Sequence, residues 1–359
     1  MVQRFENFHP PPKDGDDDIW ARALSHRRIL RFADDDPSSR DVDTSSPDVE
    51  HAYRSSFSPT HDLEDSVDQN DGVFEDLTPV AVHVGQFGHY DEAPDGRPAT
   101  LRSPWSIDCA CDGRLLIVDA DSGSVQIFAR NGDCLSGFRL VGARAACFIR
   151  DVARGELQAV VTSSGVSICD QTGCVDKHLP VGTDVVGVAP LRHGGGIFAA
   201  AHRNRITICD SYKPTAVLRS ISCVRPMNTP LGHSGIQFSD IVALATTATP
   251  RLYVVDAATV QAVDTRTGTL LQTIAASLCQ PTAVAVDLVT GSVFVCDSRT
   301  GRVMQFDADG GRRRCLVELA NDVGRCVALA AGPRTPDGHQ LIYVVCRGPA
   351  SAEVRMYQI

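Results

Sequence analysis

The sequence predicts an all-β protein, a six-bladed β-propeller of four-stranded antiparallel blades. Three observations predict this fold. Short apolar segments separated by Gly, Asp, Asn and Pro follow one another from about residue 79 to the end of the chain. These segments recur in groups at blade-sized intervals, and the last group lacks a fourth strand, which a segment ahead of the first group can supply.

The clearest group begins at Pro104. Its four expected strands span residues 104–110, 114–119, 124–128 and 134–138. Asn131-Gly132 favours the positive φ values of a two-residue hairpin turn before the last strand. A second good copy, starting at Pro281, matches the first strand for strand, and weaker copies begin at residues 145, 185, 240 and 326.

The ends of the second strands show the spacing of the groups. They fall at Asp119, Thr162, Ala201, Asp256, Asp297 and Cys346, in steps of 43, 39, 55, 41 and 49 residues. A blade of four strands needs roughly 40–50 residues. A Pro/Gly-rich loop insertion at residues 222–235 accounts for the long third step.

The two extremities of the repeat region are expected to close the ring. The sixth copy ends at Ile359 after its third strand, whereas the strand-like segment Pro79–Gly85 precedes the first copy. Placing that segment as the outer strand of the last blade removes exposed strand edges. The sequence therefore predicts a propeller over residues 79–359, closed by an N-terminal strand.

Residues 1–76 differ from the rest in composition. They hold 19 Asp/Glu against 8 Lys/Arg, while the remaining chain holds 25 acids and 26 bases. Such an acidic, weakly apolar stretch cannot offset its ordering entropy, which predicts a disordered acidic leader. Within it, residues 19–32 could form a short helix that docks on a partner, or a transient helix with no role.

Composition also limits the compartment and the chemistry of cysteine. No apolar run approaches the roughly 18–20 residues of a membrane helix, and the charged start lacks the apolar stretch of a signal peptide. The 13 cysteines follow no paired spacing and many sit in apolar strands, which predicts reduced core side chains. We therefore expect a cytoplasmic protein without membrane association.

The strand motifs resemble those of NHL-repeat propellers, found at the C-terminus of tripartite-motif proteins and in brain-tumour-type translational repressors. The resemblance is carried by residues 84–88, 103–108, 115–119 and 124–128, and in the fifth blade by Asp287, Asp297, Arg302 and Phe306. It implies a binding domain that selects substrates for ubiquitin ligases or reads RNA. The chain shows no RING, B-box or coiled-coil pattern, so ubiquitin-transfer activity is not carried over.

Known catalytic and metal motifs do not fit this sequence. Gly232-His-Ser-Gly235 resembles a nucleophile elbow, but the pattern is broken at Ile236. The sequence has no P-loop, dinucleotide fingerprint or His-Glu-x-x-His motif, and Cys109-x-Cys111 is the nearest approach to zinc-ligand spacing. Repeated aspartates such as Asp119 and Asp297 are expected to bind backbone amides. We therefore expect a protein that is not an enzyme and uses no cofactor or metal.

Surface recognition remains, on the face where the second strands end and successive blades connect. There we expect a partner-binding set of Arg102, Trp105, Arg144, Arg203, Arg205, Arg225, Arg299, Arg302, Arg325 and Arg347, joined by His89, Tyr90 and His202. Protein docking is the favoured function, since arginine and aromatic residues dominate protein interfaces. The alternative is single-stranded RNA binding, which needs positive charge with stacking aromatics. A solvated mixed-charge rim would also explain the arginines.

Overall fold

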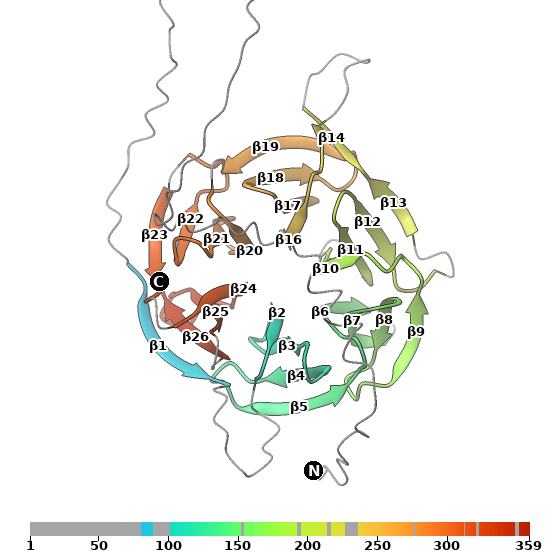
Figure 1. Ribbon diagram of the computed structural model, residues 1–359, viewed down its shortest axis with the longest axis horizontal. Coiled ribbons are helices and arrows are strands. Elements are labelled where there is room, and N and C mark those ends of the chain that lie inside the picture. The colour runs from blue at the N-terminus through green and yellow to red at the C-terminus, as the bar shows by residue number, and fades with distance from the viewer. Residues whose placement is uncertain are drawn as a thin grey trace, which may run out of the picture. The chain divides into compact units, whose positions relative to one another are not determined.

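A computed structural model shows the repeat region as a closed ring of six β-sheets (Figure 1). The structure describes residues 80–88, 101–151, 154–191, 195–213, 217–226, 236–275, 278–311, 313–320, 323–348 and 352–359. The expected acidic leader lies outside these residues. No helix long and apolar enough to cross a membrane occurs within the described ranges.

Each of the first three blades is built from four consecutive strands. Blade one contains β2 (Pro104–Cys109), β3 (Leu115–Asp119), β4 (Ser124–Phe128) and β5 (Cys134–Arg139). Blade two contains β6 (Ala145–Asp151), β7 (Gly155–Thr162), β8 (Gly165–Cys169) and β9 (Val175–Leu179). Blade three contains β10 (Val185–Pro190), β11 (Ile197–His202), β12 (Ile206–Asp210) and β13 (Val217–Ile221).

The last three blades include the insertion and the closing strand. Blade four contains β14 (Cys223–Pro226), β15 (Ile236–Gln237), β16 (Ile241–Thr246), β17 (Arg251–Asp256), β18 (Thr259–Asp264) and β19 (Thr269–Ala275). Blade five contains β20 (Pro281–Val286), β21 (Val293–Asp297), β22 (Arg302–Phe306) and β23 (Arg313–Glu318). Blade six contains β24 (Arg325–Ala331), β25 (Leu341–Arg347), β26 (Ala352–Gln358) and, from the other end of the region, β1 (Val82–Phe87).

The closing strand pairs as expected. β1 is antiparallel to β26, with Val82 opposite Gln358 and Phe87 opposite Val354. The strand begins after Pro79, the start of the expected segment, and ends beyond Gly85, its expected end. It has a bulge between His83 and Gly85. A Cβ at Gly85 would lie 2.6 Å from the Cε atom at the flexible end of the Met356 side chain, so a larger residue here requires that this side chain shift. Of residues 84–88, which carry part of the resemblance described above, residues 84–87 lie in this strand.

The hydrophobic core consists of six clusters, each between two neighbouring blades. The cluster between blades six and one includes Tyr343 and Phe128, both fully buried. Phe87 of β1 packs there with its ring centroid 5.1 Å from that of Phe128. Every blade therefore buries both of its faces against its neighbours, and closure of the ring leaves no blade without a neighbour on either side.

Two local expectations were wrong. Only Gly132 of the Asn131-Gly132 pair has positive φ, at 94°, and its N–H donates to the Ala129 carbonyl, 2.9 Å away. The hairpin loop is therefore longer than two residues, with a register shift before Phe128. The second is the insertion of blade four. It contributes strands as well as loop, because β14 pairs in parallel with β19 and extends that sheet to six strands.

Candidate binding face

The upper face is defined here as the face where first strands begin and second strands end in each blade. In blade five, for example, Pro281 at the start of β20 lies opposite Asp297 at the end of β21, and Asp297 lies opposite Arg302 of β22. The opposite side of the ring is called the lower face. Loops on the upper face join the second strand to the third, and one blade to the next.

Buried aspartates fix these loops. The Asp297 carboxylate accepts hydrogen bonds from the backbone N–H groups of Cys279 and Gln280 at 3.0 and 2.9 Å. Asp119 accepts the Ser103 N–H at 2.9 Å. In blade four, Asp256 accepts the Asp240 N–H at 2.7 Å. The expected amide-binding role of these residues is confirmed, and it ties the segment entering each of these blades to the end of its second strand.

The structure places nine of the ten predicted binding residues on the upper face. Each lies within three residues of the beginning of a first or third strand, or of the end of a second strand. Arg225 is the exception, because its backbone lies in β14 opposite Thr269, at the outer edge of blade four where β19 begins near the lower face. His89 and Tyr90 lie outside the described residues. The upper location is thus geometrical, and the binding role of the set stays a prediction.

Trp105 and Arg347 are brought together although 242 positions separate them in the sequence. The Arg347 guanidinium lies 4.4 Å from the centroid of the Trp105 ring. One of its nitrogens donates to Ser103 Oγ at 3.2 Å. Burial lowers the pKa of Arg347, and the nearby Asp121 carboxylate opposes this effect. The guanidinium stays charged, because its ordinary pKa is far above neutrality.

A cavity of about 490 Å³ opens beside this stack, between blades five and six. Arg299 approaches it from the loop after β21, Arg325 from the start of β24, and Arg347 from the end of β25. Arg325 and Arg347 are direct cross-strand partners. Three of the predicted arginines therefore line one concave site.

Two other arginines of the upper face are paired with carboxylates. Arg302 contacts Glu318 at 2.9 Å, and Arg205 contacts Asp184 at 3.1 Å. In contrast, the side chains of Arg299 and Arg325 are exposed and form no ion pair with any described carboxylate. Two arginines of the described upper face without a carboxylate partner thus lie at the cavity.

Blade three contains a buried histidine, His202, whose two ring nitrogens both contact polar side chains. His202 is fully buried, with Nδ1 2.8 Å from Asp184 Oδ1 and Nε2 3.0 Å from Thr207 Oγ1. Burial lowers the pKa of His202, against the opposing effect of Asp184. Thr207 is only 4% exposed, so a substrate cannot reach its hydroxyl. The Asp-His-Thr arrangement is therefore a structural network.

Comparison with known families gives one match. Residues 278–306, which comprise the entry to blade five and its first three strands, match the NHL repeat. Together with the six-bladed ring, this match supports an NHL-repeat β-propeller. No curated protein matches its sequence significantly. NHL propellers generally act as non-catalytic scaffolds for proteins or RNA.

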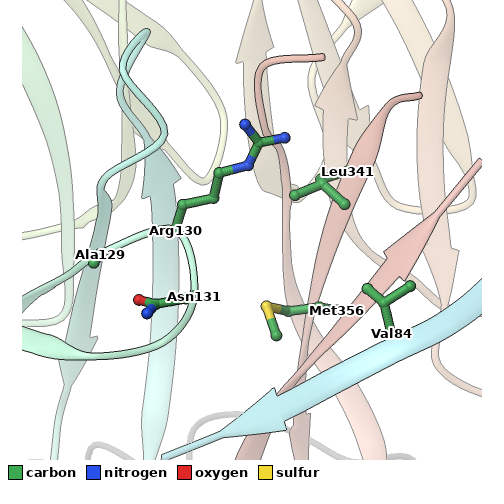
Figure 2. Close-up of a pocket in the computed structure, with 6 residues that line it drawn as sticks. All are labelled: Val84, Ala129, Arg130, Asn131, Leu341 and Met356. Atoms are coloured by element: carbon green, nitrogen blue, oxygen red, sulfur yellow. The ribbon is translucent and has the colours of Figure 1, made fainter. Parts of the chain in front are cut away.

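The NHL propeller has a second, more apolar cavity of about 560 Å³ at the seam between blades six and one. Figure 2 shows Val84, Leu341 and Met356 on the blade-six side, facing a loop of blade one. Arg130 of this loop donates to the Pro333 carbonyl at 3.3 Å, and Tyr343 Oη donates to the Arg130 carbonyl at 3.3 Å. These bonds tie blade one to blade six, so we interpret the cavity as part of the ring closure.

Most of the described cysteines are buried core side chains of the propeller. Eight of the twelve cysteines with described side chains are buried, and all twelve are free thiols. Burial raises the pKa of Cys209 and Cys346 to about 12, which keeps these thiols protonated and unreactive. No group of three His, Cys, Asp or Glu residues in the described part is arranged to hold a metal.

The sequence did not predict the two glycines, Gly324 and Gly301, whose backbone forms part of the cavity wall. Gly324 has φ +89°, and a Cβ there would lie 2.5 Å from the carbonyl carbon of Arg347. Gly301, with φ +67°, lies on the opposite wall, where a Cβ would approach the Leu319 carbonyl oxygen to 3.2 Å. Glycines beside arginines at blade ends were the available signal, but the sequence alone does not show which blades adjoin.

Proposed function

We propose that the NHL propeller is a non-catalytic platform that docks a protein partner on its upper face. One observation carries the proposal: Arg347 is stacked on Trp105 beside a cavity that Arg299 and Arg325 also line. Arginine and tryptophan are the residue types that most often dominate the affinity of protein interfaces. The aspartate-anchored loops limit the entropy lost on binding.

Single-stranded RNA is the competing ligand, and the uncompensated arginines suit it as well. RNA readers also need exposed aromatic faces on which bases stack. Trp105 is half-buried and Arg347 covers one face of its ring. The described loops of the upper face offer no other exposed aromatic side chain. These features favour a protein, and the selection of a substrate for a ubiquitin ligase would be one form of such docking.

The test compares two charge-reversal variants with the wild-type chain. The face variant carries Arg203→Glu, Arg299→Glu and Arg325→Glu. The control variant carries the same number of reversals at exposed sites away from the upper face, Arg219→Glu, Arg266→Glu and Arg313→Glu. Thermal unfolding checks that both variants keep the fold. Proteins and RNAs that co-purify with each form are then quantified by mass spectrometry and sequencing, with and without ribonuclease.

The proposal expects specific proteins that bind wild type and control but are lost from the face variant, regardless of ribonuclease. Direct titration of the identified protein against the three purified forms must reproduce that order of affinities. Enrichment of RNA alone, lost in the face variant, would instead establish the RNA alternative. Equal recovery of every partner by the face variant would refute a role for the upper face.

A further inference from the structure

The cavity between blades five and six holds positive charge that no carboxylate of the described residues neutralises. The nearest described acidic side chains have other partners. Asp297 is bound to backbone amides at 2.9–3.0 Å, and Glu318 is paired with Arg302 at 2.9 Å. The carboxylate of the exposed Asp121 interacts electrostatically with Arg347 and favours its charged form, which opposes the lowering of its pKa by burial. Two positive charges, those of Arg299 and Arg325, thus remain without a described carboxylate partner.

These charges are held in a shaped site. Arg325 lies next to Arg347 in the β24–β25 ladder, and Gly324 permits the close approach of the two chains that a Cβ would block. The Arg299 backbone N–H bonds to Asp297 at 3.3 Å, which anchors the other wall. The Arg347 guanidinium donates one hydrogen bond to Ser103 and stacks on Trp105. These contacts fix its position in the absence of a ligand. The preorganised Arg347 guanidinium loses little entropy when it binds an anion.

We propose that this cavity binds a phosphorylated side chain of the partner protein. The inference rests on the proposed docking function and names the chemical group that the site recognises. A phosphoryl group carries a charge of about −1.5 to −2 and three acceptor oxygens. It therefore matches two uncompensated arginines and a third that keeps most of its donors, whereas one carboxylate would leave positive charge in excess.

Guanidinium geometry supports the same choice. Arginine binds phosphate through two parallel hydrogen bonds, and several arginines converging on one point favour a tetrahedral anion. A cavity of about 490 Å³ has room for a phosphoryl group and its attached side chain. RNA would present phosphates in a row, but Arg302 beside the cavity and Arg205 in blade three are already paired with carboxylates. The cavity therefore suits a single phosphoryl group better than the successive phosphates of an RNA backbone.

The test titrates the full chain with fluorescent degenerate nonapeptide pools, read by fluorescence anisotropy. Three pools carry phosphoserine, phosphothreonine or phosphotyrosine at the centre, matched pools carry Ser, Thr or Tyr there, and one further pool carries Glu. A uridine decamer is the RNA probe. The variants are Arg299→Ala and Arg325→Ala, with Arg266→Ala as the matched control, since Arg266 is an exposed arginine in a turn at the lower face.

At least one phosphorylated pool should bind roughly 10-fold or more tightly than its unphosphorylated match. Each cavity variant should weaken that binding by roughly 10- to 100-fold, the loss expected for hydrogen bonds to a charged group. Arg266→Ala should leave the affinity unchanged, and millimolar inorganic phosphate should compete.

Equal affinity for phosphorylated and unphosphorylated pools would overturn the phosphate inference, as would an absence of binding by all pools. The docking proposal would survive either result if the face variant still loses protein partners in the co-purification. Tight binding of the uridine decamer alone, weakened by the cavity variants, would overturn both proposals.

Discussion

Asp297→Ala should destabilise the propeller by about 3 kcal/mol. The Asp297 side chain is 4% exposed, and its carboxylate accepts the N–H groups of Cys279, Gln280 and Arg299 at 3.0, 2.9 and 3.3 Å. A hydrogen bond to a charged group contributes about 1.5–3 kcal/mol when buried. Cys279 and Gln280 are exposed, so water can rehydrate part of the loss, and we take about 1 kcal/mol for each bond.

Urea denaturation followed by circular dichroism measures this loss directly. For a domain of about 280 residues, about 3 kcal/mol corresponds to a fall in Tm of about 5 °C. Asp297→Asn keeps one acceptor oxygen and should lose about half as much. Asp309→Ala serves as the control, because Asp309 is an exposed turn residue whose carboxylate binds one backbone N–H, that of Gly311. A change of less than about 0.5 kcal/mol for Asp297→Ala, the range of ordinary surface substitutions, would refute the reasoning.

Three further perturbations test the geometry. Gly324→Ala should cost clearly more free energy of unfolding than Gly338→Ala, because both positions have positive φ but only the first would place a Cβ against backbone, at Arg347; equal midpoints in urea would contradict the packing argument. Because the folded-state pKa of His202 is lowered, stability should fall as pH decreases below about 6.5, by up to about 1.4 kcal/mol per pH unit; His202→Gln should flatten that dependence in urea titrations from pH 7.0 to 5.5, and an unchanged slope would exclude His202 as its source. Deleting residues 80–88 removes β1 and bares the edge of β26, so light scattering should detect aggregation and Tm should fall; an unaltered monomer would show that closure is dispensable.

Much of the fold was predictable because propeller blades are locally encoded. Alternating apolar segments and turn residues at Pro104 and Pro281 marked complete blades, and those strands agree with the structure within about two residues. The closing strand followed from counting, since one strand was missing at the end and one was left over at the beginning. The two-residue hairpin at Asn131-Gly132 was wrong because the Ala129 N–H pairs with the Asp133 carbonyl at 2.7 Å, which leaves a three-residue loop with positive φ at Gly132 alone.

The candidate site was only partly predictable. Repeat position alone assigned nine of the ten residues to one face, because every blade presents the same strand ends there. It could not assign Arg225, since the insertion that carries it pairs with the outer strand of blade four. Nor could it separate Arg302, neutralised by Glu318, from Arg299 and Arg325, because that distinction depends on contacts across strands and between blades.

The pairing of β1 with β26 determines how the propeller can be attached to other objects. Both the start of β1 and the end of β26 lie at the lower face, since Val82 is opposite Gln358. The chain ends beside the closing strand at the rim of blade six (Figure 1). A bead, sensor chip or fused domain joined through Ile359 would therefore be attached at the lower face, and the upper face with its arginines would stay accessible to solution. Immobilisation through this terminus would present the same face to a binding partner on each of these supports.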